Sequence, residues 1–184
     1  MTKSLKSIVI FLVLSHCLLL PGSGQAQKPQ PAPMAPVPPQ ITAAKKIFIG
    51  NAGGDERSYE ESRFSGGPDR AYNQFYAAMK GWAHYEIVTA PADADLLLEV
   101  RFTAPEVDRS GGNGLGEHRY DPQFRLEIRD PKTTALLWGF TEHAQWAVLQ
   151  GNRDKNFDLA LAKLASDLER VAQTPTSSDG AKNP

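Results

Sequence analysis

The alternation of apolar and polar residues between Asp95 and Thr103 is the feature of the sequence that most restricts the fold. The apolar members occupy every second position and are Leu96, Leu98, Val100 and Phe102. A period of two places these side chains on one face of a β-strand and the intervening ones, including Glu99 and Arg101, on the other. The segment therefore predicts a strand with one buried face and one exposed face.

Two later segments repeat this alternation and predict two further strands. Their apolar residues are Phe124, Leu126 and Ile128, followed by Leu136, Trp138 and Phe140. The segment 130–133, Asp-Pro-Lys-Thr, predicts the turn between them. Because both sets have even numbers, they share one face only when directly opposed residues have numbers with an even sum. Pairing Ile128 with Leu136 meets this condition and is the predicted register.

Two segments have the periodicity of helices. The first follows Gly67-Pro68-Asp69, where proline and aspartate suit a first helical turn. The second follows the polar residues 152–156. Their apolar stripes are Tyr72, Phe75, Met79 and Trp82, and Phe157, Leu161, Leu164, Leu168 and Val171. Such stripes are typical of helices that pack against a core. Two short apolar runs, 45–49 and 85–88, predict the remaining strands, and the polar, glycine-rich segment 104–121 predicts a long loop.

The expected element order is β-α-β-β-β-β-α. Two apolar helical stripes and one apolar sheet face are most simply buried against each other. We therefore predict an α+β protein that is a two-layer α/β sandwich. A mostly antiparallel sheet of about five strands carries two helices on one face in this architecture.

The N-terminal segment has the organisation of a secretory signal peptide. Two lysines precede an apolar run from Ile8 to Leu20, and Gly24 and Ala26 supply the small residues of a cleavage site. The expected cleavage after Ala26 removes residues 1–26 and yields a periplasmic or secreted protein. No transmembrane helix is expected to remain after this cleavage.

Cys17 is the single cysteine of the chain. A lipid anchor at Cys17 is an alternative, but His16 is not the small residue that a lipoprotein signal places before its cysteine. The apolar run also continues past Cys17, which favours a cysteine inside the signal peptide. A lone cysteine in this segment leaves none for a disulfide or a thiol nucleophile in the folded part.

Composition divides the rest of the chain into a linker, a domain and a tail. Residues 27–43 are proline-rich and predict a disordered linker. Residues 44–172 contain every predicted strand and helix and are expected to form a single α/β sandwich domain. Residues 173–184 are polar and predict a disordered tail. The chain length of 184 residues suits one ordinary domain.

No catalytic residue, cofactor or metal site is predicted. The segment 50–54 follows a strand but lacks the Gly-Lys-Ser/Thr ending of a phosphate loop, and 112–116 leads into a strand instead of a helix. A net charge of −1 gives no field that would attract nucleic acid. The alternative is a small periplasmic hydrolase or metal-dependent enzyme that uses His118, Glu142 or His143.

The sequence favours an exported, non-catalytic envelope protein that binds another periplasmic or envelope component. The candidate partner surface combines the exposed sheet face with the start of the last helix: Glu99, Arg101, Arg125, Glu127, Arg129, Asn152, Arg153 and Asp154. The other interpretation of the sheet residues is that opposite charges pair and keep the face soluble. The other interpretation of the polar cluster at 152–154 is helix capping. The partner and the oligomeric state stay open.

Four motifs resemble those of a family of uncharacterised exported bacterial proteins over residues 45–171. They are Ala-Asp-Leu-Leu-Leu-Glu-Val (94–100), Arg-Leu-Glu-Ile-Arg-Asp-Pro-Lys-Thr (125–133), Leu-Leu-Trp-Gly-Phe-Thr-Glu (136–142) and Gly-Asn-Arg-Asp-Lys-Asn-Phe (151–157). The sheet motifs are more loosely similar to domain-of-unknown-function envelope lipoproteins and to TolB amino-terminal-like domains. The looser resemblance implies a role in envelope assembly or protein contact, and neither family supplies catalytic residues.

Overall fold

A computed structural model of the chain describes residues 35–54, 63–110 and 117–175. The predicted signal peptide, Cys17 and the glycine-rich segment 112–116 lie outside these residues, as do residues 27–34 of the predicted linker and 176–184 of the predicted tail. The elements in chain order are α1 (Pro39–Ala43), β1 (Lys46–Gly54), α3 (Arg70–Trp82), β2 (Glu86–Ile87), the 3₁₀-helix η1 (Pro91–Asp93), β3 (Leu96–Thr103), β4 (Glu106–Ser110), β5 (Glu117–Tyr120), β6 (Gln123–Arg129), β7 (Leu136–His143) and α4 (Gln150–Ala172).

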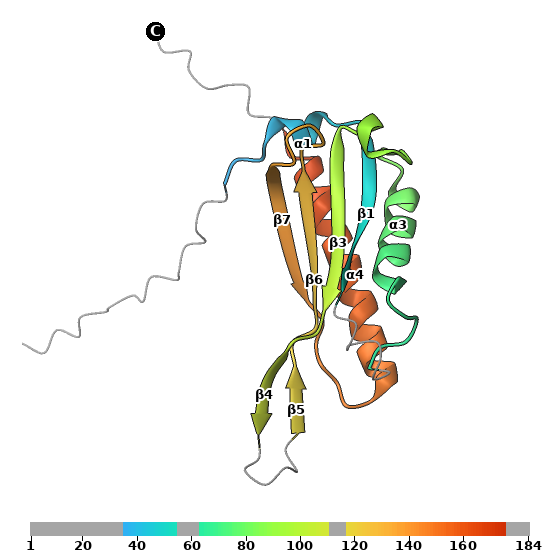
Figure 1. Ribbon diagram of the computed structural model, residues 1–184, viewed down its shortest axis with the longest axis vertical. Helices are drawn as coiled ribbons and strands as arrows, with labels where there is room; N and C mark the ends of the chain where they lie inside the picture. Colours follow the sequence, from blue (N-terminus) through green and yellow to red (C-terminus); the bar gives the residue numbers. More distant parts are fainter. Residues whose placement is uncertain (1–34, 55–62, 111–116, 176–184) are drawn as a thin grey trace, which may run out of the picture. The chain divides into compact units, whose positions relative to one another are not determined.

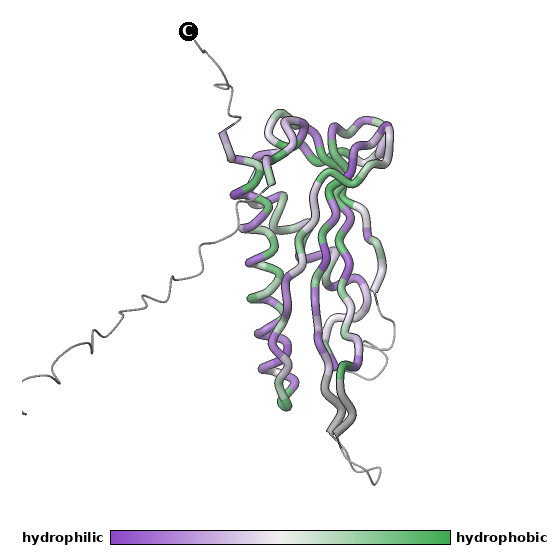
Figure 2. The backbone as a smooth tube through the Cα atoms, turned by 90° about the vertical axis from the view of Figure 1, so that its left-hand side faces the viewer, coloured by the Kyte–Doolittle hydropathy of each residue, from purple (hydrophilic) through white to green (hydrophobic). Residues whose placement is uncertain are grey.

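Five strands form a mixed sheet in the order β2-β1-β3-β6-β7 (Figure 1). β1 runs parallel to β2 and β3, and the pairs β3–β6 and β6–β7 are antiparallel. Helices α3 and α4 contact each other and pack on one side of the sheet (Figure 2). The predicted α+β class and two-layer sandwich are confirmed. The parallel pairing of β1 with β3 follows from the crossover through α3, which returns the chain to the end where β1 began.

The core lies between the sheet and the two helices. β3 and β6 contribute their even-numbered apolar side chains, as the alternation predicted. The largest fully buried side chains include Phe75, Phe102, Phe124, Phe157, Leu96, Leu98, Leu126, Ile128 and Leu164. Purple and green alternate along much of the backbone in Figure 2, the pattern expected of strands and helices with one apolar and one polar face.

The register between β6 and β7 differs from the predicted one by two residues. Ile128 lies opposite Trp138, not Leu136. An irregularity at the start of β7 then places Arg129 opposite Leu136. The parity argument holds, but it does not fix the length of the turn. The carboxylate of Asp130 holds that turn by accepting hydrogen bonds from the backbone N–H groups of Lys132 and Thr133, each at 2.8 Å.

The position of β7 at the edge of the sheet limits the burial of its apolar residues. Trp138 and Phe140 are on the predicted side but only half-buried, and Leu136 is exposed. The helices therefore complete the core over β3 and β6 more fully than over β7.

Three elements, α1, β4 and β5, occur where the sequence predicted irregular structure. Helix α1 lies within the predicted linker 27–43, and its Ile41 is fully buried in the core. The packed structure thus begins before Ala44, because a single apolar residue in a proline-rich segment has a place in the core. Strands β4 and β5 pair as a two-stranded antiparallel sheet inside the predicted loop 104–121. Among the described residues, no helix has the length and apolar character needed to cross a membrane.

The hydrogen bonds that the Asp95 carboxylate accepts from a distant segment lead us to expect a loss of stability in acid. Asp95 accepts hydrogen bonds from the backbone N–H groups of Lys45 and Lys46 at 2.8 and 2.9 Å, which hold its pKa below the usual value. A depressed folded pKa adds stability that is complete above the unfolded pKa of about 3.9 and is lost as pH falls through the folded value. The urea midpoint is expected to fall as the pH drops below about 4, and Asp95→Asn should reduce this fall. An equal pH dependence in both proteins would contradict this role of Asp95.

Candidate functional site

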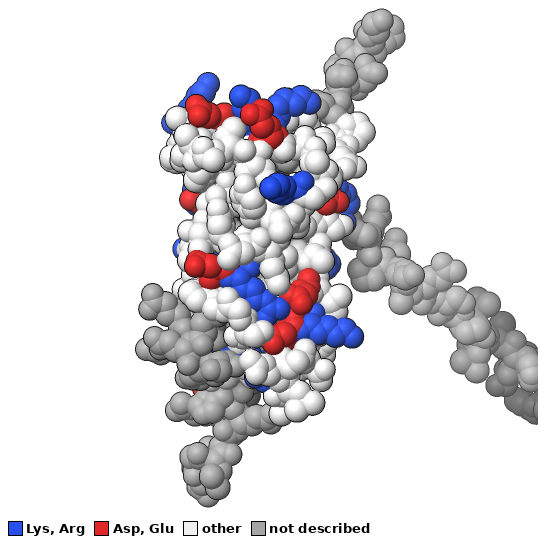
Figure 3. Space-filling model, turned by 90° about the vertical axis from the view of Figure 1, so that its right-hand side faces the viewer, with Lys and Arg blue, Asp and Glu red and all other residues white. Residues whose placement is uncertain are grey.

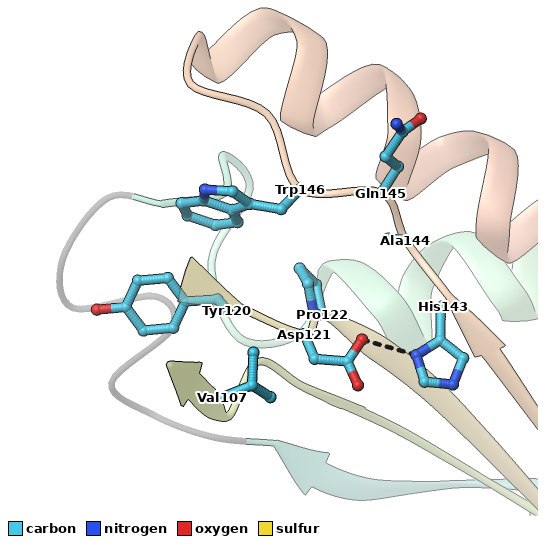
Figure 4. A pocket seen from close by; sticks show the side chains of 8 residues that line it. All are labelled: Val107, Tyr120, Asp121, Pro122, His143, Ala144, Gln145 and Trp146. Atoms are coloured by element: carbon cyan, nitrogen blue, oxygen red, sulfur yellow. Dashed lines mark hydrogen bonds and ion pairs between the residues drawn. The ribbon is translucent and has the colours of Figure 1, made fainter. Parts of the chain in front are cut away.

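An open pocket lies where the five-stranded sheet meets the β4–β5 hairpin (Figure 4). Its volume is about 710 Å³, within the range of about 300–1,000 Å³ that is common for binding pockets. The residues that line it are Val107, Tyr120, Asp121, Pro122, His143, Ala144, Gln145 and Trp146. They come from β4, the end of β5, the connection between β5 and β6, the end of β7 and the segment before α4.

Backbone hydrogen bonds at the ends of the strands hold the floor of this pocket. The N–H of Ala144 donates to the carbonyl oxygen of Pro122 at 2.7 Å, which extends the pairing of β6 and β7 by one position. The N–H of Asp121 donates to the carbonyl oxygen of Pro105 at 3.0 Å and joins the two ends of the hairpin. Pro122 and Ala144 are both buried. The pocket therefore rests on the rigid end of the sheet.

Aromatic rings form one wall, and two arginines hold them. The ring centroids of Tyr120 and Trp146 are 5.0 Å apart. The guanidinium carbon of Arg63 lies 3.8 Å from the centroid of the Tyr120 ring, and that of Arg153 lies 5.1 Å from the Trp146 ring. Arg153 also donates from Nε to the carbonyl oxygen of Arg63 at 2.6 Å. These cation–π contacts and hydrogen bonds orient both rings before any ligand arrives.

A polar pair lies on the opposite side of the pocket. Nδ1 of His143 is 2.7 Å from Oδ1 of Asp121, drawn as a dashed line in Figure 4. A carboxylate in this position orients an imidazole, as in hydrolase triads, but such a reaction also requires a nucleophile. The described residues that line the pocket include no serine, threonine, cysteine or lysine. The pair can accept or donate hydrogen bonds to a bound group.

The structure does not bring Glu142 and His143, two residues of the predicted enzyme alternative, into one site. Glu142 is directed to the opposite side of β7 from His143 and forms an ion pair with Lys163 at 2.7 Å. His118 lies on β5, and its side chain is outside the described part of the structure. The described segments contain no group of three or more His, Cys, Asp or Glu side chains able to hold a metal ion.

Three large apolar side chains are exposed, one in the lining of the pocket and two in the segment that follows Trp146. We call Val107, Val148 and Leu149, whose exposed fractions are 56%, 77% and 67%, the apolar rim. Val148 and Leu149 follow the Trp146 wall. Arg153 donates to the carbonyl oxygens of Ala147 and Val148 and so fixes this segment. The segment that carries Val148 and Leu149 is therefore held in place, with both side chains exposed to solvent.

The charged residues of β3 and β6 share the sheet face that the helices leave uncovered, as predicted. The register places Glu99 opposite Glu127 and Arg101 opposite Arg125, and like charges in direct opposition are unfavourable. Diagonal and same-strand ion pairs relieve this repulsion. They join Arg129 to Glu99 at 3.0 Å, Arg125 to Glu127 at 3.0 Å and Arg129 to Glu127. These residues, which we call the charged face, line a shallow hollow of about 370 Å³.

The predicted cluster at 152–154 is not part of the charged face. It lies in the first turns of α4, in the other layer, and no side chain caps this helix. The carboxylate of Asp154 instead accepts hydrogen bonds from the backbone N–H and Oγ of Ser65 at 2.9 and 2.8 Å. It also pairs with Arg70 at 2.7 Å. The capping interpretation is therefore wrong, because this carboxylate binds a distant loop and α3.

Charge is dispersed over the face of the molecule that carries α3. Figure 3 shows lysine and arginine side chains interspersed there with aspartate and glutamate, with no large area of one sign. The ion pairs of Arg70 with Asp154 and Asp158 are examples of this pairing. Such a surface is typical of a solvated face, so the apolar rim is the more distinctive surface.

No protein-family model and no curated protein matches this sequence. Similar solved structures include a PelC dodecamer from Paraburkholderia phytofirmans, with 16% identity, a TM-score of 0.43 and coverage of 67% of this chain and 86% of that chain. The protein XCC0632 from Xanthomonas campestris, of family DUF330, has 11% identity, a TM-score of 0.45 and coverage of 77% and 90%. A minor lipoprotein from Acinetobacter baumannii has 14% identity, a TM-score of 0.36 and coverage of 68% and 90%.

Proposed function

We propose that this chain is an exported, non-catalytic envelope protein that binds a partner protein through the pocket and the apolar rim. The observation that carries the proposal is the pocket with aromatic walls, which has the exposed Val107 in its lining. Val148 and Leu149, which follow Trp146 in the chain, are also exposed, and exposed apolar side chains beside a pocket suit an interaction site. The apolar run and paired lysines of the N-terminal segment support export.

The chemistry of the pocket suits a protein segment that presents a large apolar side chain. Tyr120 and Trp146 offer apolar surface with little freedom left to lose, since Arg63 and Arg153 already hold their rings. Aromatic residues are enriched at the centres of protein interfaces for this reason. On the other side, Asp121 and His143 supply hydrogen-bonding groups that suit the backbone of a bound segment.

The charged face is proposed to remain in solvent when the partner is bound. Its carboxylates and guanidinium groups already pair with one another. Arg101 donates from Nε to the carbonyl oxygen of Ala52 at 3.2 Å. A partner at this face would have to replace these contacts, whereas a partner at the apolar rim removes apolar surface from water.

Affinity purification from envelope extract tests this proposal with a matched pair of variants. Val148→Asp places a charge on the rim, and Arg125→Ala removes one from the charged face. Both positions are exposed, so both variants are expected to fold. The rim variant should reduce recovery of the partner by at least about tenfold, as for loss of an interface hot spot, and Arg125→Ala should leave it unchanged. The opposite pattern, or no partner recovered with the unaltered protein, would contradict the proposal.

A further inference from the structure

Strand β7 gives the sheet one long edge with no strand beside it in the described part of the chain. The opposite edge is β2, which has only the residues Glu86–Ile87 and offers little backbone for pairing. Natural proteins shield long edges with proline, charge or bulges. The irregularity of β7 lies at its start, beside Leu136, and the strand pairs regularly with β6 from Trp138 to His143.

The hydrogen bond at the end of the strand shows which backbone groups face this edge. Ala144 directs its N–H to Pro122 on the β6 side. In an antiparallel sheet the backbone N–H and C=O groups of one residue point to the same adjacent strand, and those of the next residue point to the opposite side. The residues of β7 that face β6 are Trp138, Phe140 and Glu142. Those whose N–H and C=O face outward are Leu137, Gly139, Thr141 and His143.

The sequence of β7 is self-complementary about Gly139. When two copies run antiparallel with Gly139 opposite Gly139, Leu137 falls opposite Thr141 and Trp138 falls opposite Phe140. The outward-facing residues then exchange backbone hydrogen bonds. Trp138 and Phe140 form the closer, non-hydrogen-bonded pair, whose side chains approach most nearly. Aromatic pairs across strands stabilise a sheet.

The environment of Gly139 suits the centre of such an arrangement. A Cβ atom at this position would meet only the carbonyl oxygen of Leu126, at 3.7 Å. No described side chain therefore obstructs the approach of a second strand at Gly139 on the outer face of the sheet. On the helix side, Trp138 and Phe140 are half-buried within one chain, and their ring centroids are 6.5 Å apart. A second copy would cover the surface that the edge position leaves exposed.

We propose that β7 pairs with β7 of a second copy across a twofold axis at Gly139. The two sheets then form one continuous antiparallel edge-to-edge sheet, with the helices of both copies on the same side. The contact is isologous, so it closes after two copies and removes the free edge from both. The residues paired about the axis, Leu137 to Thr141, line neither the pocket nor the apolar rim, so the pairing stands independently of the function proposed above.

Sedimentation equilibrium and one proline substitution test the pairing. The protein purified from its own cells is expected to be a dimer that dissociates on dilution. Thr141→Pro removes an N–H that faces the free edge and leaves the hydrogen bonds to β6 in place. It should weaken the dimer by about tenfold or more, because each dimer loses two hydrogen bonds, while circular dichroism shows the same folded signal. A protein that stays monomeric at its highest soluble concentration overturns the proposal.

Cysteine substitution tests the register, with a Cys17→Ser background for both variants. Gly139 lies opposite itself at a separation of about 5.5 Å between Cα atoms, within the range that a disulfide spans. Gly139→Cys is therefore expected to give a disulfide-linked dimer on mild oxidation. Thr141→Cys, on the same face of the same strand, should not, because it faces Leu137. Linkage through position 141 but not 139 would overturn the twofold axis at Gly139, and a dimer that links at neither position would overturn pairing through β7.

Discussion

Phe157→Ala is expected to lower the free energy of unfolding by about 3–5 kcal/mol. Phe157 is fully buried. Its ring centroid lies 4.8 Å from that of Phe102 and 4.6 Å from that of Phe124, so it joins α4 to β3 and β6. It also contacts Phe64, at a centroid separation of 5.8 Å. Removing the ring opens a cavity under rigid strands that have little freedom to collapse into it.

Urea unfolding followed by circular dichroism measures this loss, and Leu159→Ala on the same helix is the matched control. Leu159 is 60% exposed, so its truncation should change stability by no more than about 0.5 kcal/mol. Equal midpoints for the unaltered protein and Phe157→Ala would contradict the packing of α4 on the sheet.

Arg70→Met is expected to destabilise the fold by about 2–3 kcal/mol, less than for a fully buried ion pair because Asp158 is partly exposed. Only 10% of the Arg70 side chain is exposed, and its guanidinium pairs with Asp154 at 2.7 Å and Asp158 at 2.6 Å. It also donates to the carbonyl oxygen of Ser65 at 3.0 Å and lies 4.2 Å from the centroid of the Phe157 ring. Methionine keeps apolar volume but leaves Asp154 with one partner fewer.

The pH dependence of this effect distinguishes lost pairing from lost packing. Burial alone would raise the pKa of Asp154, but hydrogen bonds from Ser65 and Arg70 outweigh it and hold the pKa below the usual value. The contribution of the pair is complete above the unfolded pKa of about 3.9 and disappears as pH falls through the folded pKa. The difference between Arg70→Met and the unaltered protein should therefore shrink in acid. Arg125→Met, which removes an exposed pair, should cost no more than about 1 kcal/mol, and a similar cost for both would contradict the account.

The sheet and helices were predictable where periodicity was strong. The alternation in 96–103 and the stripe from Phe157 to Val171 each specify one buried face, and the structure buries those faces. The two-residue error in the β6–β7 register arose at the turn. The turn held by the Asp130 carboxylate is longer than the predicted one, and the pairing is irregular beside Leu136. A parity rule fixes which face a residue occupies but not the length of the turn.

The binding pocket was less predictable because its residues are far apart in the sequence. Val107 and Tyr120 belong to a hairpin that was expected to be a loop, since its sequence lacks a clear alternation. Trp146 lies in no regular element and reaches the pocket only because β7 ends beside β6. His143 was considered as an enzyme residue, and its proximity to Asp121 depends on the same tertiary pairing.

Site-specific photo-crosslinking in cells tests partner binding at the apolar rim most directly. A photoreactive amino acid replaces Val107 in one variant, Arg125 on the charged face in a second and Gly81 on α3 in a third, all exposed positions. The account predicts a discrete adduct with another protein from position 107 and none from positions 125 and 81. An adduct from position 125 alone, or no adduct from position 107, would contradict it.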